Sequence, residues 1–178
     1  LMAHPLNQKT GSRGVIRVRP DRATHARPIR CMMLAMTGRY PEEFTWRWDM
    51  PDGGRILVRP IRPEDAEPLQ TLVRGLSEEA RYFRFISALS ELPPRMLYRY
   101  TQIDYDREMA LVAVYGERTA RDDGGFDEAE RIVGVSRIIT NPDQTSCEFS
   151  LLVADDFGGK GLGSRLMEGI TDAAREKG

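Results

Sequence analysis

The sequence is poor in the residues that build disulfide frameworks, metal centres and histidine-based active sites. It has two cysteines and two histidines in 178 residues. Two cysteines cannot form a framework of several bridges, which favours a reducing compartment, and they fall short of the four close ligands of a structural zinc site. Both histidines, His4 and His25, lie in the first 38 residues. The rest of the chain therefore has no histidine for a Ser-His-Asp hydrolase.

Long apolar runs are also absent from the sequence. No stretch approaches the roughly 18 apolar residues of a membrane-spanning helix, and the short apolar run at 31–36 lies too deep in the chain for a secretory signal. Hydrophobic residues make up 40% of the chain and charged residues 30%, which is typical of a globular domain. We therefore expect a cytoplasmic protein with no membrane partner.

The first 38 residues differ in composition from the rest. The first 40 residues hold eight basic residues and one acid, a net charge of +7, which leaves −8 on the other 138. Prolines recur there without a helix or strand period, which predicts a basic, flexible extension over residues 1–38. No aromatic residue precedes Tyr40, so the extension has no ring on which bases could stack, and we do not expect a nucleic-acid partner. A transit peptide, or untranslated sequence read as protein, has the same composition.

From residue 39 onward the hydrophobic pattern is regular and predicts an α+β domain. Alternating apolar residues predict strands, and apolar stripes of helical period predict helices. We expect strands at 44–48, 55–60, 108–116, 131–140 and 146–153, helices that open at 63, 77, 95 and 162, and a surface loop over 117–130. The short connections make the last three strands an antiparallel meander. On the second helix we expect Tyr82, Phe83 and Phe85 in the core, and Arg81 and Arg84 toward solvent or the acidic loop.

The most informative segment, residues 155–164, reads DDFGGKGLGS and joins the last predicted strand to the last predicted helix. Glycines let a backbone approach a ligand closely, and the free N–H groups of a helix start attract phosphate. The segment is not a P-loop, because Ala154 and Gly161 stand where that motif needs glycine and Ser or Thr. It is not a dinucleotide fingerprint either, since the third glycine would be Leu166. The alternative to an anion site is a plain helix start whose glycines serve close packing.

The segment resembles the pyrophosphate loop of the GNAT acetyltransferase superfamily, which reads Gln/Arg-x-x-Gly-x-Gly/Ala. Gly161 and Gly163 match its two glycines, and Gly158 stands at the Gln/Arg position. Five further segments are similar to the branch formed by bacterial protein lysine acetyltransferases: 40–43, 52–53, 59–65, 81–85 and 101–110. In that branch the domain occurs alone, with a cyclic-nucleotide domain, or fused to an NDP-forming acyl-CoA synthetase-like protein.

The resemblance covers about residues 40–178 and implies a GNAT acyl-CoA acyltransferase domain over 39–178, with a mixed, mostly antiparallel sheet flanked by helices. It implies acetyl-CoA as co-substrate, no metal, and a protein partner with an exposed lysine, an acyl-CoA synthetase being one candidate. The last strand is expected to splay from its neighbour and pair with the pantetheine arm through the backbone of Leu151, Leu152 and Val153. The pyrophosphate is expected on the loop, at Gly158, Gly159, Lys160, Gly161, Leu162, Gly163 and Ser164.

Transfer to lysine needs a base, because the amine is almost fully protonated at neutral pH. Glu148 is the candidate, since it lies in the strand before the loop between apolar neighbours, a setting that suits a base. In the family the base lies on this strand, ten residues before the Gln/Arg position, which from Gly158 is Glu148. The alternative is an acid on an edge strand that faces water.

Domains of this superfamily continue after the helix that here ends near Gly178, with another strand, a helix and further strands. We therefore expect a domain truncated at its C-terminal end, an open sheet edge at 146–153, and weak binding of acetyl-CoA by this chain alone. Two other interpretations stay open. One is an acetyltransferase for small amines, and the other is a non-catalytic acyl-CoA-sensing module of a synthetase-like protein. The sequence does not predict the oligomeric state.

Overall fold

The computed structural model describes residues 11–16, 39–50, 54–85, 89–120, 126–142 and 146–177. They form one six-stranded sheet in the order β1-β6-β5-β4-β3-β2, and every neighbouring pair is antiparallel. The strands are β1 Gly11–Ile16, β2 Trp46–Asp49, β3 Arg55–Pro60, β4 Glu108–Ala120, β5 Phe126–Thr140 and β6 Cys147–Val153. The α-helices are α1 Ala66–Arg74, α2 Glu78–Phe85, α3 Pro94–Thr101 and α4 Leu162–Lys177. Three short 3-10 turns, η1 Glu42–Phe44, η2 Pro63–Asp65 and η3 Asp155–Phe157, complete the described elements.

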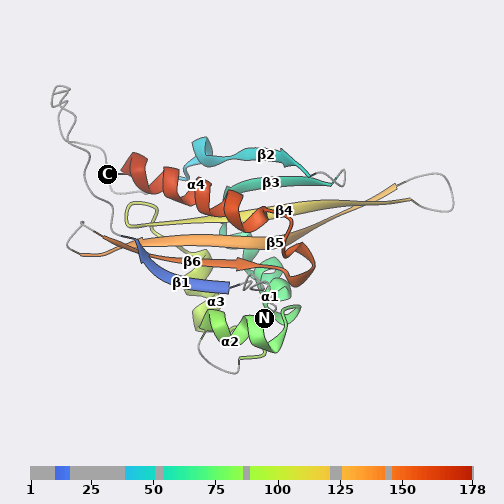
Figure 1. Cartoon of the computed structure of the whole chain (residues 1–178), viewed down its shortest axis with the longest axis horizontal. Coiled ribbons are helices and arrows are strands. Elements are labelled where there is room, and N and C mark those ends of the chain that lie inside the picture. The colour runs from blue at the N-terminus through green and yellow to red at the C-terminus, as the bar shows by residue number, and fades with distance from the viewer. Residues whose placement is uncertain are drawn as a thin grey trace, which may run out of the picture.

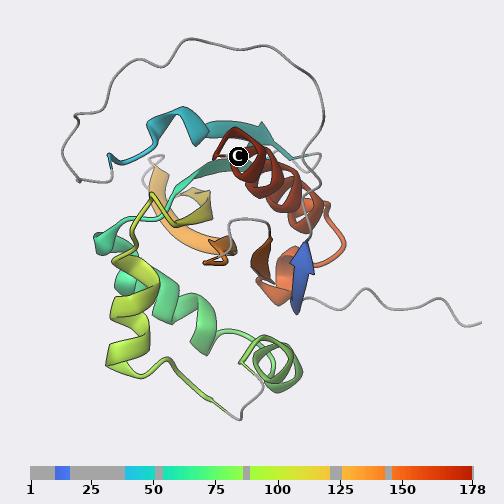
Figure 2. The same ribbon diagram turned by 90° about the vertical axis from the view of Figure 1, so that its left-hand side faces the viewer.

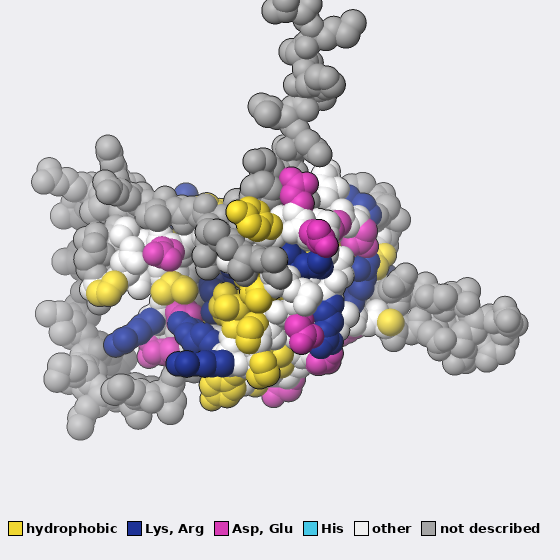
Figure 3. Space-filling model, turned by 90° about the horizontal axis from the view of Figure 1, so that it is seen from below, with side chains coloured by type: hydrophobic (Ala, Val, Ile, Leu, Met, Phe, Trp, Pro, Cys, Tyr) yellow, Lys and Arg dark blue, Asp and Glu magenta, His cyan; other side chains and the backbone are white. Residues whose placement is uncertain are grey.

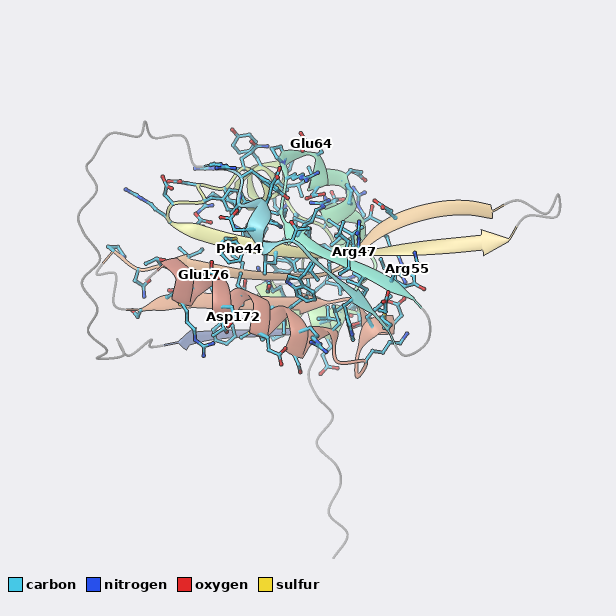
Figure 4. All side chains as sticks on the ribbon, turned by 90° about the horizontal axis from the view of Figure 1, so that it is seen from above. Phe44, Arg47, Arg55, Glu64, Asp172 and Glu176 are labelled. Atoms are coloured by element: carbon cyan, nitrogen blue, oxygen red, sulfur yellow. The ribbon has the colours of Figure 1, made fainter. Side chains whose placement is uncertain are left out.

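Helices cover both faces of the sheet, as the α+β prediction requires (Figures 1 and 2). Helix α4 lies on one face, and α1, α2 and α3 lie on the other. The stripe predicted for α4 is confirmed, because its inward side chains are fully buried: Leu162, Leu166, Ile170 and Ala173. The outer side of α4 carries charge instead, and Figure 4 shows Asp172 and Glu176 there. This division gives the sheet two buried faces, so the strand residues on each face pack against a different set of helices.

The start of α1 is fixed by the buried carboxylate of Asp65. Its two oxygens each accept a hydrogen bond of 2.7 Å from the Arg59 guanidinium, and Oδ2 also accepts one of 2.7 Å from the backbone N–H of Arg62. The hydrogen bond to Asp65 raises the pKa of Arg59 above its usual value. Pro63 stands at the first position of the turn, where its missing N–H costs nothing. The predicted helix opening at residue 63 is therefore confirmed, with one 3-10 turn before the α-helix.

The hairpin of β4 and β5 is longer than predicted. Residues 117–120 and 126–130 continue the two strands, with pairing up to Ala120 opposite Phe126, so the predicted loop over 117–130 is wrong outside 121–125. Residues 121–125 lie outside the described ranges. This end of the hairpin projects beyond the helices (Figure 1). Because no helix covers it, its strands need no apolar face, and the sequence lacks the alternation that marks a half-buried strand.

Strand β1 belongs to the basic segment at the start of the chain. It pairs along its whole length with β6, from Gly11 opposite Leu152 to Ile16 opposite Cys147. The prediction of an open edge at 146–153 is therefore wrong for residues 147–152. The other residues of the predicted 1–38 extension lie outside the described ranges. A strand of six residues is too short to show a clear period in the sequence. Its partner lies more than a hundred residues away, so the pairing is entirely non-local and leaves no local signal.

The face seen from below, which carries α1, α2 and α3, mixes charged side chains of both signs with hydrophobic ones (Figure 3). Tyr82 on α2 is 56% exposed. Its prediction as a core residue is therefore wrong, since it lies on the outer side of a helix whose buried side holds Ala80 and Arg84.

In the described ranges, no three His, Cys, Asp or Glu side chains come together as a metal site. Of the helices that the structure describes, none has the length and apolar character needed to cross a membrane.

Candidate active site

Two glycines of the loop between β6 and α4 adopt a backbone conformation that other residues rarely reach. Gly159 has φ 74° and Gly161 has φ 84°. Space is not the constraint there, because a Cβ on Gly159 would meet no atom within 4 Å and one on Gly161 would lie 4.0 Å from the Trp48 ring. Gly163 differs, since its Cβ would lie 3.4 Å from Leu151 Cδ2. The first two glycines shape the loop through their backbone conformation, whereas a Cβ at Gly163 would make an ordinary contact with β6.

The start of α4 presents backbone N–H groups at this loop. Helical bonding begins where the Arg165 N–H donates to the Gly161 carbonyl, at 3.1 Å. The N–H groups of Leu162, Gly163 and Ser164 are those that a helix leaves without an intrahelical partner, and the helix dipole adds positive potential beside them. The Leu162 side chain is fully buried, so this residue can offer a ligand only its backbone. The predicted loop residues thus come together as a helix start with the geometry of an anion site.

Side chains on both sides hold the loop in place. The buried Phe157 meets the Tyr115 ring edge-on, with 5.0 Å between centroids, and Lys160 Nζ lies 4.8 Å from the Phe157 centroid. Asp155 Oδ2 accepts a hydrogen bond of 2.6 Å from the backbone N–H of Ser77, just before α2. The loop is therefore attached to the hairpin on one side and to the helices of the other layer on the other side.

The edge of β6 that was predicted to receive the pantetheine arm carries β1. Leu151 lies opposite Ser12, and Leu152 lies opposite Gly11. On the other side β6 stays paired with β5 as far as Val153 opposite Gly134, so the predicted splaying of these two strands is not seen. Val153 lies beyond the end of β1. Among the residues that the structure describes, β1 thus covers the edge at Leu151 and Leu152, and no described residue pairs with Val153 on that side.

Glu148 lies on β6 where the sequence predicts it, but its surroundings differ from the prediction. The residue is exposed rather than held among apolar side chains. The physical reason is strand alternation, because its sequence neighbours Cys147 and Phe149 point to the opposite face. On its own face Glu148 is followed by Ser150 and Leu152. The carboxylate is thus open to solvent, on the side of the sheet that carries α1, α2 and α3.

Sequence reasoning missed two buried arginines near Glu148. Arg84 on α2 is 7% exposed and Arg137 on β5 is 5% exposed, so the prediction that Arg84 faces solvent or the acidic loop is wrong. Arg84 shares the buried side of α2 with Ala80, because the two are four residues apart, which is the spacing of one helix face. Its guanidinium donates to Ser150 Oγ at 3.1 Å. That four-residue spacing is the pattern from which its burial could have been predicted.

Arg137 is held by one acid and one aromatic residue. Its guanidinium donates to Glu108 Oε2 at 3.2 Å and to the Tyr100 carbonyl, and it lies 4.9 Å from the centroid of the Tyr100 ring. Burial lowers the pKa of Arg137 to about 10, Glu108 opposes that shift, and the positive charge of Arg84 adds to it. Arg137 therefore stays a cation at neutral pH.

The comparison with protein families identifies the fold. A model of the acetyltransferase (GNAT) family matches residues 76–178, more than half of the chain. The chain belongs to the GNAT family of acetyltransferases, and its fold is the GNAT fold that the glycine loop predicts. Enzymes of this family use acetyl-CoA. The chain is thus an acetyltransferase by family.

Two relatives support this assignment. The chain is 36% identical to Acetyltransferase PA5475 of Pseudomonas aeruginosa over 133 residues, which is 75% of this chain and 67% of that protein. Among solved structures, the GNAT domain of S. lividans PAT superposes with a TM-score of 0.63 at 28% identity, over 79% of this chain and 77% of that one. Family membership leaves the acceptor of the acetyl group open, either a protein lysine or a small amine.

Proposed function

We propose that the chain transfers the acetyl group of acetyl-CoA to the ε-amine of a lysine on a protein. The observation that carries this proposal is the order of three parts along the chain. Glu148 lies on β6, the glycine loop follows it, and the free N–H groups at the start of α4 come next. The resemblance of 81–85 and 101–110 to the lysine acetyltransferase branch supports lysine as the acceptor. An acyl-CoA synthetase, the partner implied by that resemblance, is the first protein to assay.

In this proposal the N–H groups of Leu162, Gly163 and Ser164 bind the pyrophosphate of acetyl-CoA, and the exposed residues 158–161 wrap around it. The pantetheine arm then lies along β6 and pairs with its backbone from Val153 toward Leu151. Because β1 covers Leu151 and Leu152 in the structure, the arm reaches them when β1 leaves the edge. In this proposal the backbone N–H groups of β6 between Leu151 and Val153 also polarise the thioester carbonyl.

A lysine ammonium must lose two protons to become an amide nitrogen. Glu148 accepts the first, directly or through a water, which leaves the neutral amine. The amine nitrogen then attacks the thioester carbonyl carbon, the N–C bond forms and the C–S bond breaks, and the second proton of the nitrogen passes to the departing coenzyme A thiolate. The exposed position of Glu148 lets it return its proton to solvent after each turnover.

The test is the substitution Glu148→Gln, with Glu176→Gln as the matched control. Glu176 is exposed on α4, away from β6. We expect Glu148→Gln to lower the rate of transfer to a lysine peptide by roughly a hundredfold or more, the usual contribution of a general base. Acetyl-CoA binding, measured by isothermal titration, should stay as in the wild type. Full activity of Glu148→Gln would contradict the role of Glu148, and binding without transfer in the wild type would favour the sensing module.

A further inference from the structure

Helix α2 is attached at both of its ends to the part of the chain that carries the site. At its start, the backbone N–H of Ser77, the residue before the helix, donates a hydrogen bond of 2.6 Å to Asp155 Oδ2. Near its end, Arg84 donates to Ser150 Oγ at 3.1 Å. Ser150 lies in β6 and Asp155 follows that strand, so one helix bridges the strand of Glu148 and the approach to the glycine loop.

The contact at Ser77 is directly connected to the glycine loop. The turn η3 begins at Asp155, and the Gly158 N–H donates to the Asp155 carbonyl at 3.1 Å. Gly158 is the first residue of the segment expected to hold the pyrophosphate. A movement of the loop at Gly158 therefore shifts the backbone of Asp155, and with it the carboxylate that faces α2.

Helix α2 buries little apolar surface of its own. It is eight residues long, and a helix of this length has little stability in water without tertiary contacts. Among its side chains that the structure describes, Ala80 and Arg84 are buried, and Phe85 is partly buried against the core. An element with few buried apolar contacts opens locally at a low free energy. The polar contacts at its two ends therefore decide how well α2 is ordered.

The carboxylate of Asp155 supports the start of α2. Ser77 Oγ caps the helix by accepting a hydrogen bond of 3.3 Å from the Ala80 N–H, and a carboxylate beside a helix start is favoured by the helix dipole. Asp155 and Ser77 are both exposed. Water competes for such a hydrogen bond, so its net contribution is small. It therefore forms most fully when the loop holds the carboxylate in place.

We propose that Asp155 is a positioning residue that couples the binding of acetyl-CoA to the order of α2. The inference rests on the proposed function, in which residues 158–161 wrap around the pyrophosphate and Glu148 faces the acceptor amine. Binding fixes the loop, the fixed loop holds the carboxylate against the Ser77 N–H, and the start of α2 becomes ordered. Ser150, which contacts α2, lies on the same face of β6 as Glu148. The acceptor side is thus better ordered once acetyl-CoA is bound.

Hydrogen exchange followed by mass spectrometry tests this coupling without turnover. In the wild type we expect saturating acetyl-CoA to slow the exchange of the backbone N–H groups of 78–82 by about fivefold or more, the lower end of typical coupling between two sites. The loop should be protected at the same time. In Asp155→Ala the loop should keep its protection, whereas the response of α2 should be lost. Asp155→Asn should keep part of that response, because its amide oxygen still accepts a hydrogen bond.

The matched control is Asp156→Ala. Asp156 is the next residue of the same turn, is exposed, and pairs with Arg131 on β5 rather than with α2. This variant should keep the wild-type response. If Asp155 only stabilises the fold, Asp155→Ala will speed the exchange of α2 by the same factor with and without acetyl-CoA, which overturns the proposal. A wild-type α2 that does not respond while the loop is protected also overturns it.

A binding measurement distinguishes this coupling from the proposed function. Fluorescence anisotropy of a labelled lysine peptide is measured with and without coenzyme A, which carries the pyrophosphate but no acetyl group. We expect coenzyme A to tighten peptide binding by about fivefold in the wild type and Asp156→Ala, but not in Asp155→Ala.

The possible outcomes separate the two claims. A response of α2 that depends on Asp155, with no binding of the peptide, supports the coupling and contradicts the proposed acceptor. Equal tightening of peptide binding in Asp155→Ala and the wild type overturns the coupling and leaves the proposed function standing. Exchange that acetyl-CoA changes neither in the loop nor in α2 contradicts both.

Discussion

Gly134 on β5 lies against α4, and Gly134→Ala tests how tightly the helix packs on the sheet at this point. A Cβ at this position would lie 2.7 Å from Leu166 Cδ1, 3.3 Å from the Leu152 carbonyl oxygen and 3.4 Å from Leu162 Cδ2. Carbon atoms in contact normally lie about 3.5–4.0 Å apart. Leu162 and Leu166 are fully buried, so the clash is relieved only if Leu166 or the whole helix moves by roughly an ångström.

The size of the effect follows from comparison with Gly116→Ala. Gly116 is an exposed glycine of β4, and a Cβ there would meet no atom within 4 Å. Both substitutions lower the entropy of the unfolded chain by the same amount, which favours folding by about 0.4–1 kcal/mol. That contribution cancels in the difference between the two variants. What remains is the cost of overpacking, about 1–3 kcal/mol, so Gly134→Ala should be less stable than Gly116→Ala by this amount.

The assay is urea unfolding of both variants, with the midpoint compared at unchanged slope. A second background, Leu166→Ala, removes the methyl group that clashes, and Gly134→Ala should then lose most of its penalty. The resulting cycle isolates the contact between the two positions. Equal stability of Gly134→Ala and Gly116→Ala, or an unchanged penalty in the Leu166→Ala background, would refute the packing geometry described for α4.

Three further predictions concern the site and its supports. Glu108→Ala should lower the free energy of unfolding by about 3 kcal/mol, because the buried Arg137 guanidinium loses its carboxylate partner. The control Glu91→Ala removes an exposed ion pair with Arg74 and should leave the free energy of unfolding nearly unchanged. Replacing Arg13 and Gly14 by proline removes backbone donors of β1 and should raise the affinity for acetyl-CoA, because the β6 edge opens. Burial raises the pKa of Tyr105. The neutral phenol therefore contributes to stability in full below about pH 10, and this contribution is lost as the pH rises further. Tyr105→Phe should reduce the loss of stability between about pH 9 and 11.

Each of these predictions has a contradicting result. Equal losses for Glu108→Ala and Glu91→Ala in urea unfolding would mean that the buried pair adds nothing beyond an exposed one. Isothermal titration that shows unchanged or weaker acetyl-CoA binding in the double proline variant would mean that β1 does not compete for the edge. For Tyr105, an alkaline fall in stability as steep in the phenylalanine variant as in the wild type would show that other groups cause it.

The sequence predicts the parts of the fold that repeat a local pattern. The stripe of α4 follows from the period of its apolar residues, the helix opening at Pro63 from the proline and acids of the first turn, and the three-strand meander from the short connections. The structure confirms all three. The long hairpin and β1 escape prediction because their pairing depends on distant residues or on strands with no apolar face. Local pattern carries no information on such pairing, since it is decided by what lies opposite in space.

The candidate site divides in the same way. The glycine loop could be predicted because Gly159 and Gly161 are needed for local backbone conformation. The exposure of Glu148 agrees with the alternative that the sequence left open, an acid that faces water, because its apolar neighbours in sequence lie on the other face of the strand. Arg84 and Arg137 were missed because charged residues are expected at the surface, and their burial depends on partners from three other elements: Ser150 on β6, Glu108 on β4 and Tyr100 on α3.

The most direct test of the central claim is mass spectrometry of the acceptor after incubation of the purified chain with acetyl-CoA and a lysine-containing peptide. The account predicts a product heavier by one acetyl group, with fragmentation placing that group on the lysine ε-amine, and one free coenzyme A for each peptide modified. Wild-type chain should form this product, and Glu148→Gln should form little of it while still binding acetyl-CoA. Release of coenzyme A without an acetylated amine, or an equal yield from Glu148→Gln, would contradict the account.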